Sequence, residues 1–278
     1  MTSPHVREIV CFEPSVLAQR LTGERHLLLL ESVMRQEHLG RYSFLACNPR
    51  STIEATHQGT FRDGIPQKDD VLSLISRTLE ANRRPFVPGL PPFQGGLAGF
   101  ISYDFGRRLE PHARIPDFAP VCPDLVMHHY DAVAAFDHMQ ERAWIIAGDT
   151  AEADRLEDLI NRKPRELGSH ALSGWQSNFS REDYECAIAR TVEYILAGDI
   201  FQANITQEFS TAIPAGFDPF AFYRMLRQRN PATFAAYLDF GTIQIASSSP
   251  ERLLKLNEIA ITQMRTLLAE PNVKRLKA

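Results

Sequence analysis

The chain has 278 residues, of which 44% are apolar and 23% charged, a mixture typical of globular proteins. Its net charge of −4 is small and unclustered, which argues against a nucleic-acid surface or a polybasic membrane patch. No run approaches the ~18 apolar residues of a membrane span, and the segment 1–14 lacks the apolar core of a signal peptide. We therefore expect a cytoplasmic protein of one large or two ordinary domains.

The first third of the chain predicts a meander of strands followed by a helix. Short apolar runs at 25–31 and 42–49 have the length of strands. The runs 52–56 and 60–62 flank a glycine-containing turn and predict a hairpin. A helix is expected over 70–82, because an aspartate can cap it and apolar residues recur on one face.

The middle of the chain begins with a proline-rich loop at 85–92. The glycines in 93–104 fit neither of the common phosphate-binding loops, and backbone packed closely beside a strand is the better interpretation. Alternating apolar residues over 132–147 predict a second hairpin, and 151–163 predicts a polar helix. The polar linker 164–177 is the expected domain boundary.

After the linker, a helix is expected over 181–197. Ser180 and Asp183 form a start of the capping-box type, and Gly198 suits the position just past the helix end. Tyr184, with the apolar residues that recur after it, would form one face of this helix.

The last part of the chain predicts a strand at 204–209, a helix and a hairpin. Asp218 would cap the helix, which ends before Asn230. The hairpin covers 234–246, and Glu251 would lie just past the end of its second strand.

The cysteines do not form a cluster. They are widely spaced, with no CxxC pair and no Cys/His group, which favours reduced, buried thiols over disulfides. They are Cys11, Cys47, Cys122 and Cys186.

Four groups of unusual residues follow one another along the chain. They are Phe-Gln-Gly-Gly at 93–96 with Gly99 and the run 103–108, then 198–204, then Asn-Pro-Ala at 230–232 with 237–239, and Ser-Ser-Ser-Pro-Glu-Arg at 247–252.

In order and spacing these strings resemble the chorismate-binding family of anthranilate and aminodeoxychorismate synthases, component I. The first string and the two alanines before Tyr237 are more similar to the aminodeoxychorismate synthases. The resemblance implies an α+β fold, a large mixed or antiparallel β-sandwich with outer helices that lacks its C-terminal part. It implies an N-terminal domain over 1–165 and an incomplete chorismate-binding domain over 178–278, of which 263–278 departs from the family pattern.

The resemblance also implies an activity. The family replaces the 4-hydroxyl of chorismate with ammonia from a glutamine amidotransferase subunit, giving 4-amino-4-deoxychorismate for 4-aminobenzoate and folate biosynthesis. The reaction needs Mg²⁺. Glu251 matches the family glutamate that assists proton transfer, and Gln202, Asn204 and Ser249 would lie near the substrate. From spacing alone, Gln202 and Asn204 equally suit a polar strand edge, and Glu251 a solvated carboxylate.

One family feature is missing. A nucleophilic lysine would fall near position 267, where this chain has Leu267, while Lys274 and Lys277 lack the flanking residues of the motif. The Mg²⁺ ligands would lie beyond residue 278, so no metal ligand is assigned in this chain. We therefore expect a truncated and inactive chain with weakened amidotransferase binding. The alternatives are a non-catalytic fragment that binds tryptophan or an amidotransferase, and a fragment of anthranilate synthase component I.

A second ligand site follows from the same resemblance. Glu31 and Ser32, with Asn230 and Pro231 opposite, match a family segment that lines a tryptophan pocket. The other interpretation is a strand end where Ser32 bonds to nearby backbone. The pair His128-His129 does not indicate a metal site, because neighbouring residues of a strand point to opposite faces.

Overall fold

The computed structural model describes residues 3–35, 39–110, 121–252 and 255. The chain divides into two compact units, one made of Met1–Arg165 with Leu226–Ala278, the other of Glu166–Met225. The structure contains helices together with sheets whose paired strands run antiparallel. This confirms the predicted α+β class.

The first unit contains a seven-stranded sheet in the order β1-β10-β9-β3-β2-β13-β14. Its interior strand β2 pairs with β3 on one side and with β13 on the other, so Leu28 lies opposite both Ala46 and Leu238. The strands are β1 (His5–Ile9), β2 (Leu28–Glu31), β3 (Tyr42–Ala46), β9 (Ala132–Asp137), β10 (Arg142–Ala147), β13 (Phe234–Asp239) and β14 (Gln244–Ser249).

A second, five-stranded sheet in the same unit has the order β6-β5-β4-β8-β7. Gly99 of β7 lies so close to β8 that an added Cβ would overlap the carbonyl oxygen of Val126. Close backbone packing therefore explains this glycine, as the sequence predicted. The strands are β4 (Ser51–Thr56), β5 (Gly59–Arg62), β6 (Ile65–Gln67), β7 (Gly96–Ile101) and β8 (Leu125–Tyr130).

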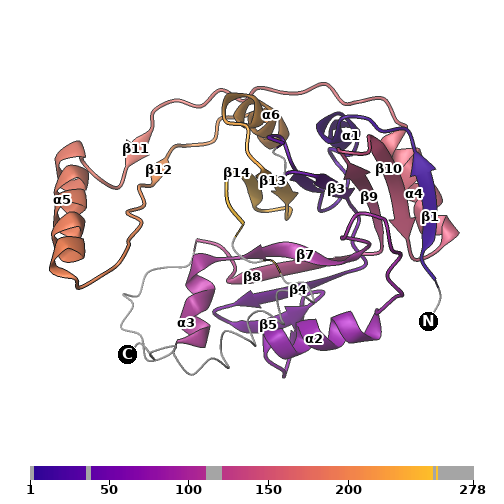
Figure 1. Ribbon diagram of the computed structural model, residues 1–278, viewed down its shortest axis with the longest axis horizontal. Helices are drawn as coiled ribbons and strands as arrows, with labels where there is room; N and C mark the ends of the chain where they lie inside the picture. The colour runs from indigo at the N-terminus through magenta and orange to yellow at the C-terminus, as the bar shows by residue number, and fades with distance from the viewer. Residues whose placement is uncertain (1–2, 36–38, 111–120, 253–254, 256–278) are drawn as a thin grey trace. The chain divides into compact units, whose positions relative to one another are not determined.

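An apolar core joins the two sheets. Leu28 and Leu238 of the larger sheet cluster with Tyr130, at the end of β8, and Phe100 of β7. The ring of Phe100 meets that of Phe240 edge to face, with the centroids 4.9 Å apart. Burial of these side chains between facing sheets supplies the main stabilisation and confirms the sandwich (Figure 1).

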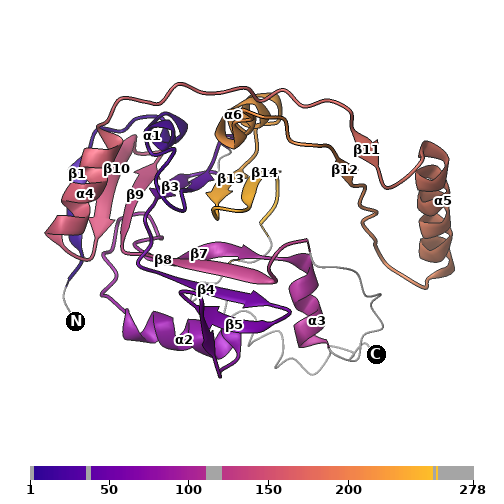
Figure 2. The same cartoon turned by 180° about the vertical axis from the view of Figure 1, so that it is seen from behind.

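Helices cover the outside of this sandwich, as Figures 1 and 2 show. α4 packs on β9 and β10, α1 on β2 and β3, and α2 on β4. The predicted cap of α2 is confirmed, because the carboxylate of Asp70 accepts from the amides of Leu72 and Ser73. The helices are α1 (Pro14–Arg20), α2 (Val71–Ala81), the 3-10 turn η1 (Tyr103–Phe105), α3 (Gly106–Leu109) and α4 (Thr150–Ile160).

The second unit is built around α5 (Arg181–Ala197) and a short ladder of β11 (Gln176–Ser177) with β12 (Phe209–Ser210). The hydroxyl of Ser180 accepts from the amide of Asp183, and Gly198 has φ +83°, so both helix ends agree with the prediction. α6 (Pro219–Arg229) begins in this unit and ends in the other.

Some sequence predictions need correction. The strand expected at 204–209 is reduced to β12, which pairs with only two residues of β11. β14 runs through Ser249 rather than ending at 246, because the serines continue the ladder with β13. All four cysteines are free, but none is fully buried as predicted: Cys11, Cys47 and Cys122 are half-buried, and Cys186 is exposed. β1 and α1 were not predicted from the sequence, and β8 was expected only as a strand at His128 and His129, without bounds.

Candidate functional site

The end of β2 lies at a cavity of about 530 Å³ in the first unit. Leu30, Phe44 and Ala236 give it apolar walls, while Arg41 and Arg252 bring positive charge to its lining. The size and the mixture of apolar and charged groups suit a small organic molecule with a carboxylate.

Glu31, the last residue of β2, is the buried acid of this cavity. Arg227 of α6 holds it in a two-pronged contact, with Nε donating to Oε2 at 2.9 Å and Nη2 donating to Oε1 at 3.0 Å. Nη2 of Arg227 also donates to Glu13 at 2.6 Å. A buried carboxylate needs such a partner, and Arg227 holds Glu31 in a fixed orientation at the cavity wall.

Ser32 follows Glu31 and is tied to the neighbouring strand. Its hydroxyl donates to the carbonyl of Tyr42 at 2.8 Å, and its amide donates to the hydroxyl of Ser43 at 3.0 Å. The hydroxyl of Ser43 also contacts Nε2 of His138 at 2.7 Å. Ser32 thus lines the cavity and bonds to backbone at the same time.

The two arginines of the cavity are held by aromatic rings. Arg41 lies over Tyr42 with its guanidinium carbon 4.9 Å from the ring centroid, and it also pairs with Asp137 at 2.7 Å. Arg252 lies over Phe234 at 5.2 Å. Arg252 is exposed and has no acidic partner among the described residues, so its donors face solvent or a ligand.

Asn230 and Pro231 do not line the cavity, although they were predicted as its opposite wall. Both are exposed, and the carbonyl of Asn230 accepts from the hydroxyl of Ser248. The next residues, Thr233 to Ala236, form the wall instead. Ala232 ties this segment to β2, since its carbonyl accepts from the amides of Val33 and Met34.

Glu251 lies just past the end of β14, as predicted. Its carboxylate is exposed, and Ser249 fixes its backbone, because the serine hydroxyl donates to the Glu251 carbonyl at 2.9 Å and accepts its amide at 3.4 Å. The structure therefore brings Ser249 and Glu251 together.

Gln202 and Asn204 belong to the second unit. Both are exposed on an irregular segment after α5. Their place beside a substrate stays a prediction.

No metal centre emerges from the described residues. Within 3–35, 39–110, 121–252 and 255, no three His, Cys, Asp or Glu side chains gather as ligands would. The donor set for Mg²⁺ is therefore not met there, and no chemical step is derived through a metal. Leu267, Lys274, Lys277 and the segment 263–278 lie outside the described residues.

The histidine pair behaves as the strand geometry predicted. His128 points into the core, where its ring stacks on Phe240, whereas His129 lines a second cavity. No membrane-spanning helix was found either: within the described chain none is both long and apolar enough.

Comparison with known proteins places the chain in a family. Residues 26–265 match the family of chorismate binding enzymes, so the chain belongs to that family.

Its relatives are synthase subunits. The chain is 33% identical to anthranilate synthase component 1 of Pseudomonas aeruginosa, over 90% of this chain and 56% of that one. It is 28% identical to aminodeoxychorismate synthase component 1 of Bacillus subtilis, over 87% of this chain and 56% of that one. The structure of anthranilate synthase component I from Streptococcus pneumoniae aligns with a TM-score of 0.65 at 25% identity, covering 86% of this chain and 59% of that one. The chain thus spans about half the length of the curated relatives it matches.

The sequence analysis could not find the most buried interaction of the site. Glu31 and Arg227 are 196 residues apart in the chain. No local spacing in the sequence links them. Arg227 lies in the last turn of a predicted helix, where basic residues are common, so nothing marks it as a partner of Glu31.

Proposed function

We propose that the chain forms part of component I of a chorismate-aminating synthase, in which ammonia replaces the 4-hydroxyl of chorismate. The observation that carries the proposal is the Ser-Pro-Glu-Arg turn after β14, where Ser249 holds the backbone of Glu251. In this role Glu251 moves a proton, and Ser249, Gln202 and Asn204 bind the polar groups of the substrate.

We favour 4-amino-4-deoxychorismate as the product of the complete enzyme. Ala235 and Ala236, which resemble the aminodeoxychorismate synthases, lie in β13 and line the first cavity. Anthranilate is the second candidate product, because anthranilate synthases are the more frequent of the similar proteins. The complete enzyme would use Mg²⁺ and an amidotransferase subunit as ammonia source.

Binding of chorismate tests this function without requiring turnover. We expect saturation-transfer NMR to detect chorismate on the 278-residue chain, and both Glu251→Gln and Ser249→Ala to weaken it. Glu193→Gln, which changes an exposed carboxylate on α5, is the matched control. Equal affinity in all variants, or no binding, would contradict the proposal.

Turnover by this chain alone is not expected. Leu267 stands where the resemblance places the nucleophilic lysine. With chorismate, ammonia and Mg²⁺ we expect no product above the level of Glu251→Gln. A co-purification with the amidotransferase subunit should give a weak, substoichiometric complex, and a stoichiometric one would contradict this expectation.

The first cavity suggests an additional amino-acid site. An α-carboxylate would meet Arg252, an α-amino group would meet Glu31, and an indole would lie against Leu30 and Phe44. Tryptophan is the candidate ligand.

Calorimetry with tryptophan tests the site. Arg252→Gln should weaken binding about tenfold, the effect of losing one charge-assisted contact. Arg181→Gln, an exposed arginine on α5, is the control. Absence of heat, or an equal loss in the control, would remove this candidate.

A further inference from the structure

A second cavity, of about 440 Å³, opens between the end of α2, the loop that leads to β7, and β8. Apart from Pro92, it shares no lining residue with the first cavity. The proposed chorismate chemistry does not use it.

His129 is the unusual residue of this second cavity. Its side chain is only 4% exposed, and it lines the cavity. Burial, with Arg84 and Arg50 nearby, lowers the pKa of His129, so the ring is neutral at pH 7. A neutral imidazole carries one N–H donor, which can bond to an acceptor of a ligand in the cavity.

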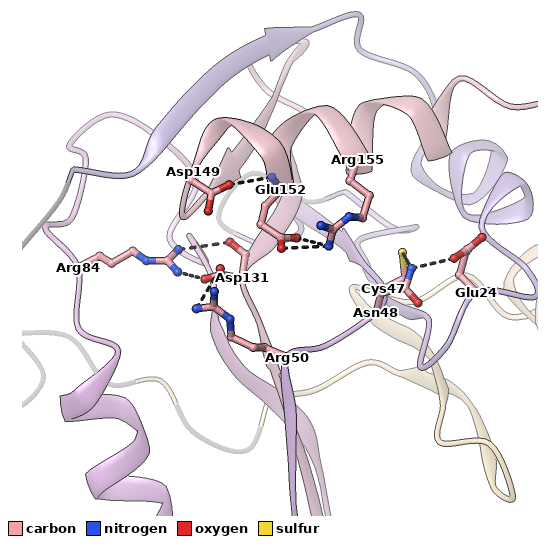
Figure 3. A network of polar contacts seen from close by, with 9 residues as sticks. All are labelled: Glu24, Cys47, Asn48, Arg50, Arg84, Asp131, Asp149, Glu152 and Arg155. Atoms are coloured by element: carbon pink, nitrogen blue, oxygen red, sulfur yellow. Dashed lines mark hydrogen bonds and ion pairs between the residues drawn. The ribbon is translucent and has the colours of Figure 1, made fainter. Parts of the chain in front are cut away.

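Arg84 brings a positive charge to the same cavity. Arg84 and Arg50 converge on the buried carboxylate of Asp131 (Figure 3). Nη1 of Arg84 also donates to the Asp131 carbonyl at 3.3 Å. Because two guanidinium groups share one carboxylate, one positive charge is left over beside the cavity.

Other carboxylates near Arg84 do not enter the cavity. Asp149 caps α4 by accepting the amide of Glu152 at 2.9 Å, and Glu152 pairs with Arg155 at 2.9 Å (Figure 3). The described lining residues include one acid, Glu80, whose Oε1 lies 3.9 Å from Nη1 of Arg83. The lining therefore carries two arginines and one acid.

The opposite side of the cavity is apolar and held in place. Leu79 and Phe86 are large, exposed apolar residues that line it. The side chain of Gln94 fixes the loop, since its Oε1 accepts from the amide of Val87 and its Nε2 donates to the Val87 carbonyl, both at 2.9 Å. A flat ring would fit against Leu79 and Phe86 without reordering the loop.

We propose that this second cavity binds a small aromatic carboxylate, with the anionic group held by Arg84 and His129 and the ring against Leu79 and Phe86.

Titration of the full chain with benzoate tests the proposal, with benzamide as the neutral analogue and inorganic phosphate as the anion without a ring. We expect benzoate to saturate, its ring protons to show NOEs to the Leu79 methyl groups, and benzamide and phosphate to bind at least about tenfold more weakly. Equal binding of benzamide or of phosphate, or NOEs to the first cavity only, would overturn the proposal.

Variants assign the contacts. His129→Phe keeps the ring volume and should weaken benzoate about tenfold, while Phe86→Ala, at an exposed site, should weaken it about threefold. Arg77→Gln, on α2 outside the cavity, should leave binding unchanged. If His129→Phe fails to fold by circular dichroism, Phe86→Ala decides. An unchanged affinity in Phe86→Ala, or an equal loss in Arg77→Gln, would refute the assignment.

Discussion

His128 lies in the core between the two sheets, where its ring stacks on His26 at 4.2 Å and on Phe240 at 5.1 Å. Thr52 contacts its Nδ1 at 2.9 Å, and its Nε2 has no hydrogen-bond partner among the described residues. Burial, and then the nearby His26 and Arg25, lower the pKa of His128 to about 3. The folded protein therefore holds this imidazole neutral well below its ordinary titration range.

The stability of the protein should consequently fall in acid. In the unfolded chain His128 takes up a proton near pH 6.5, whereas in the folded chain it does so only near pH 3. The unfolded state binds more protons in this window, so the free energy of unfolding decreases as pH falls from 6.5 towards 3, by about 3 kcal/mol at pH 4. Urea unfolding of the parent, of His128→Phe and of His57→Gln would measure it. If His128→Phe does not change how the free energy of unfolding depends on pH, the prediction is wrong. His57→Gln, at an exposed turn, is the control and should keep the pH dependence of the parent.

Gly99 should be intolerant of any side chain. Because a Cβ would overlap the Val126 carbonyl, Gly99→Ala must separate β7 from β8, at a cost of about 3 kcal/mol or more. Thermal or urea unfolding measures the loss. Gly106→Ala is the matched control, since nothing lies within 4 Å of its Cβ position and its helical φ of −54° suits alanine. Equal stability of the two variants would disprove the close packing.

α6 is fixed at its start by one carboxylate. Oδ1 of Asp218 accepts from the amides of Phe220 at 3.0 Å and Ala221 at 3.1 Å, and its Oδ2 accepts from that of Gly168 at 2.8 Å. Asp218→Ala loses the cap and leaves buried amides unpaired, so it should cost about 2–3 kcal/mol, against about 1 kcal/mol for Asp70→Ala at the exposed cap of α2. Urea unfolding of both variants compares the two. A cost for Asp218→Ala no greater than that for Asp70→Ala would contradict it.

The elements that the sequence predicted best are those with chemical signals at both ends. Ser180 and Gly198 bound α5 at the predicted residues, and Asp218 with Pro219 starts α6. The bounds of β8 were not predicted, although its two histidines were placed on a strand, because β8 is buried on both faces and lacks alternation. α1 has only seven residues, too few for a visible period.

The residues of the candidate site also differ in whether a local sequence signal marks them. Glu251, Glu31 and Ser32 were named as candidates from local strings, and their roles stay predictions. Arg227, Arg41 and the wall at 233–236 could not be named in that way, because tertiary pairing of distant segments brings them to the cavity. Asn230 and Pro231 were assigned by analogy and lie a few residues before the true wall.

At the scale of the whole molecule, the two units differ in how much apolar surface they bury. α4 of the first unit buries Ala153, Leu156, Leu159 and Ile160, whereas α5 of the second unit buries no residue, and its Leu196 is 81% exposed. A helix without buried contacts relies on propensity and capping alone.

Hydrogen exchange should therefore separate the two helices. We expect the α5 amides to exchange at least about a hundredfold faster than those of α4, since local opening of α5 exposes little new apolar surface. Exchange followed by mass spectrometry gives both rates in one experiment. Equal protection of the two helices would mean that α5 is covered in solution. We also expect the protein to bind a hydrophobic dye strongly, and a covered α5 would make that binding weak.

The place of β2 in the interior of the larger sheet affects synthesis of the protein. Leu28 leaves the ribosome early, but its partner Leu238 is added 210 residues later, since 238 − 28 = 210. At about 5–20 residues per second, the nascent chain waits roughly 10–40 s with one edge of β2 open. During that interval β3 can pair with β2, while the apolar run of four leucines from Leu27 to Leu30 stays available to other chains. Translation speed and chaperone access in that interval should therefore set the yield of native protein.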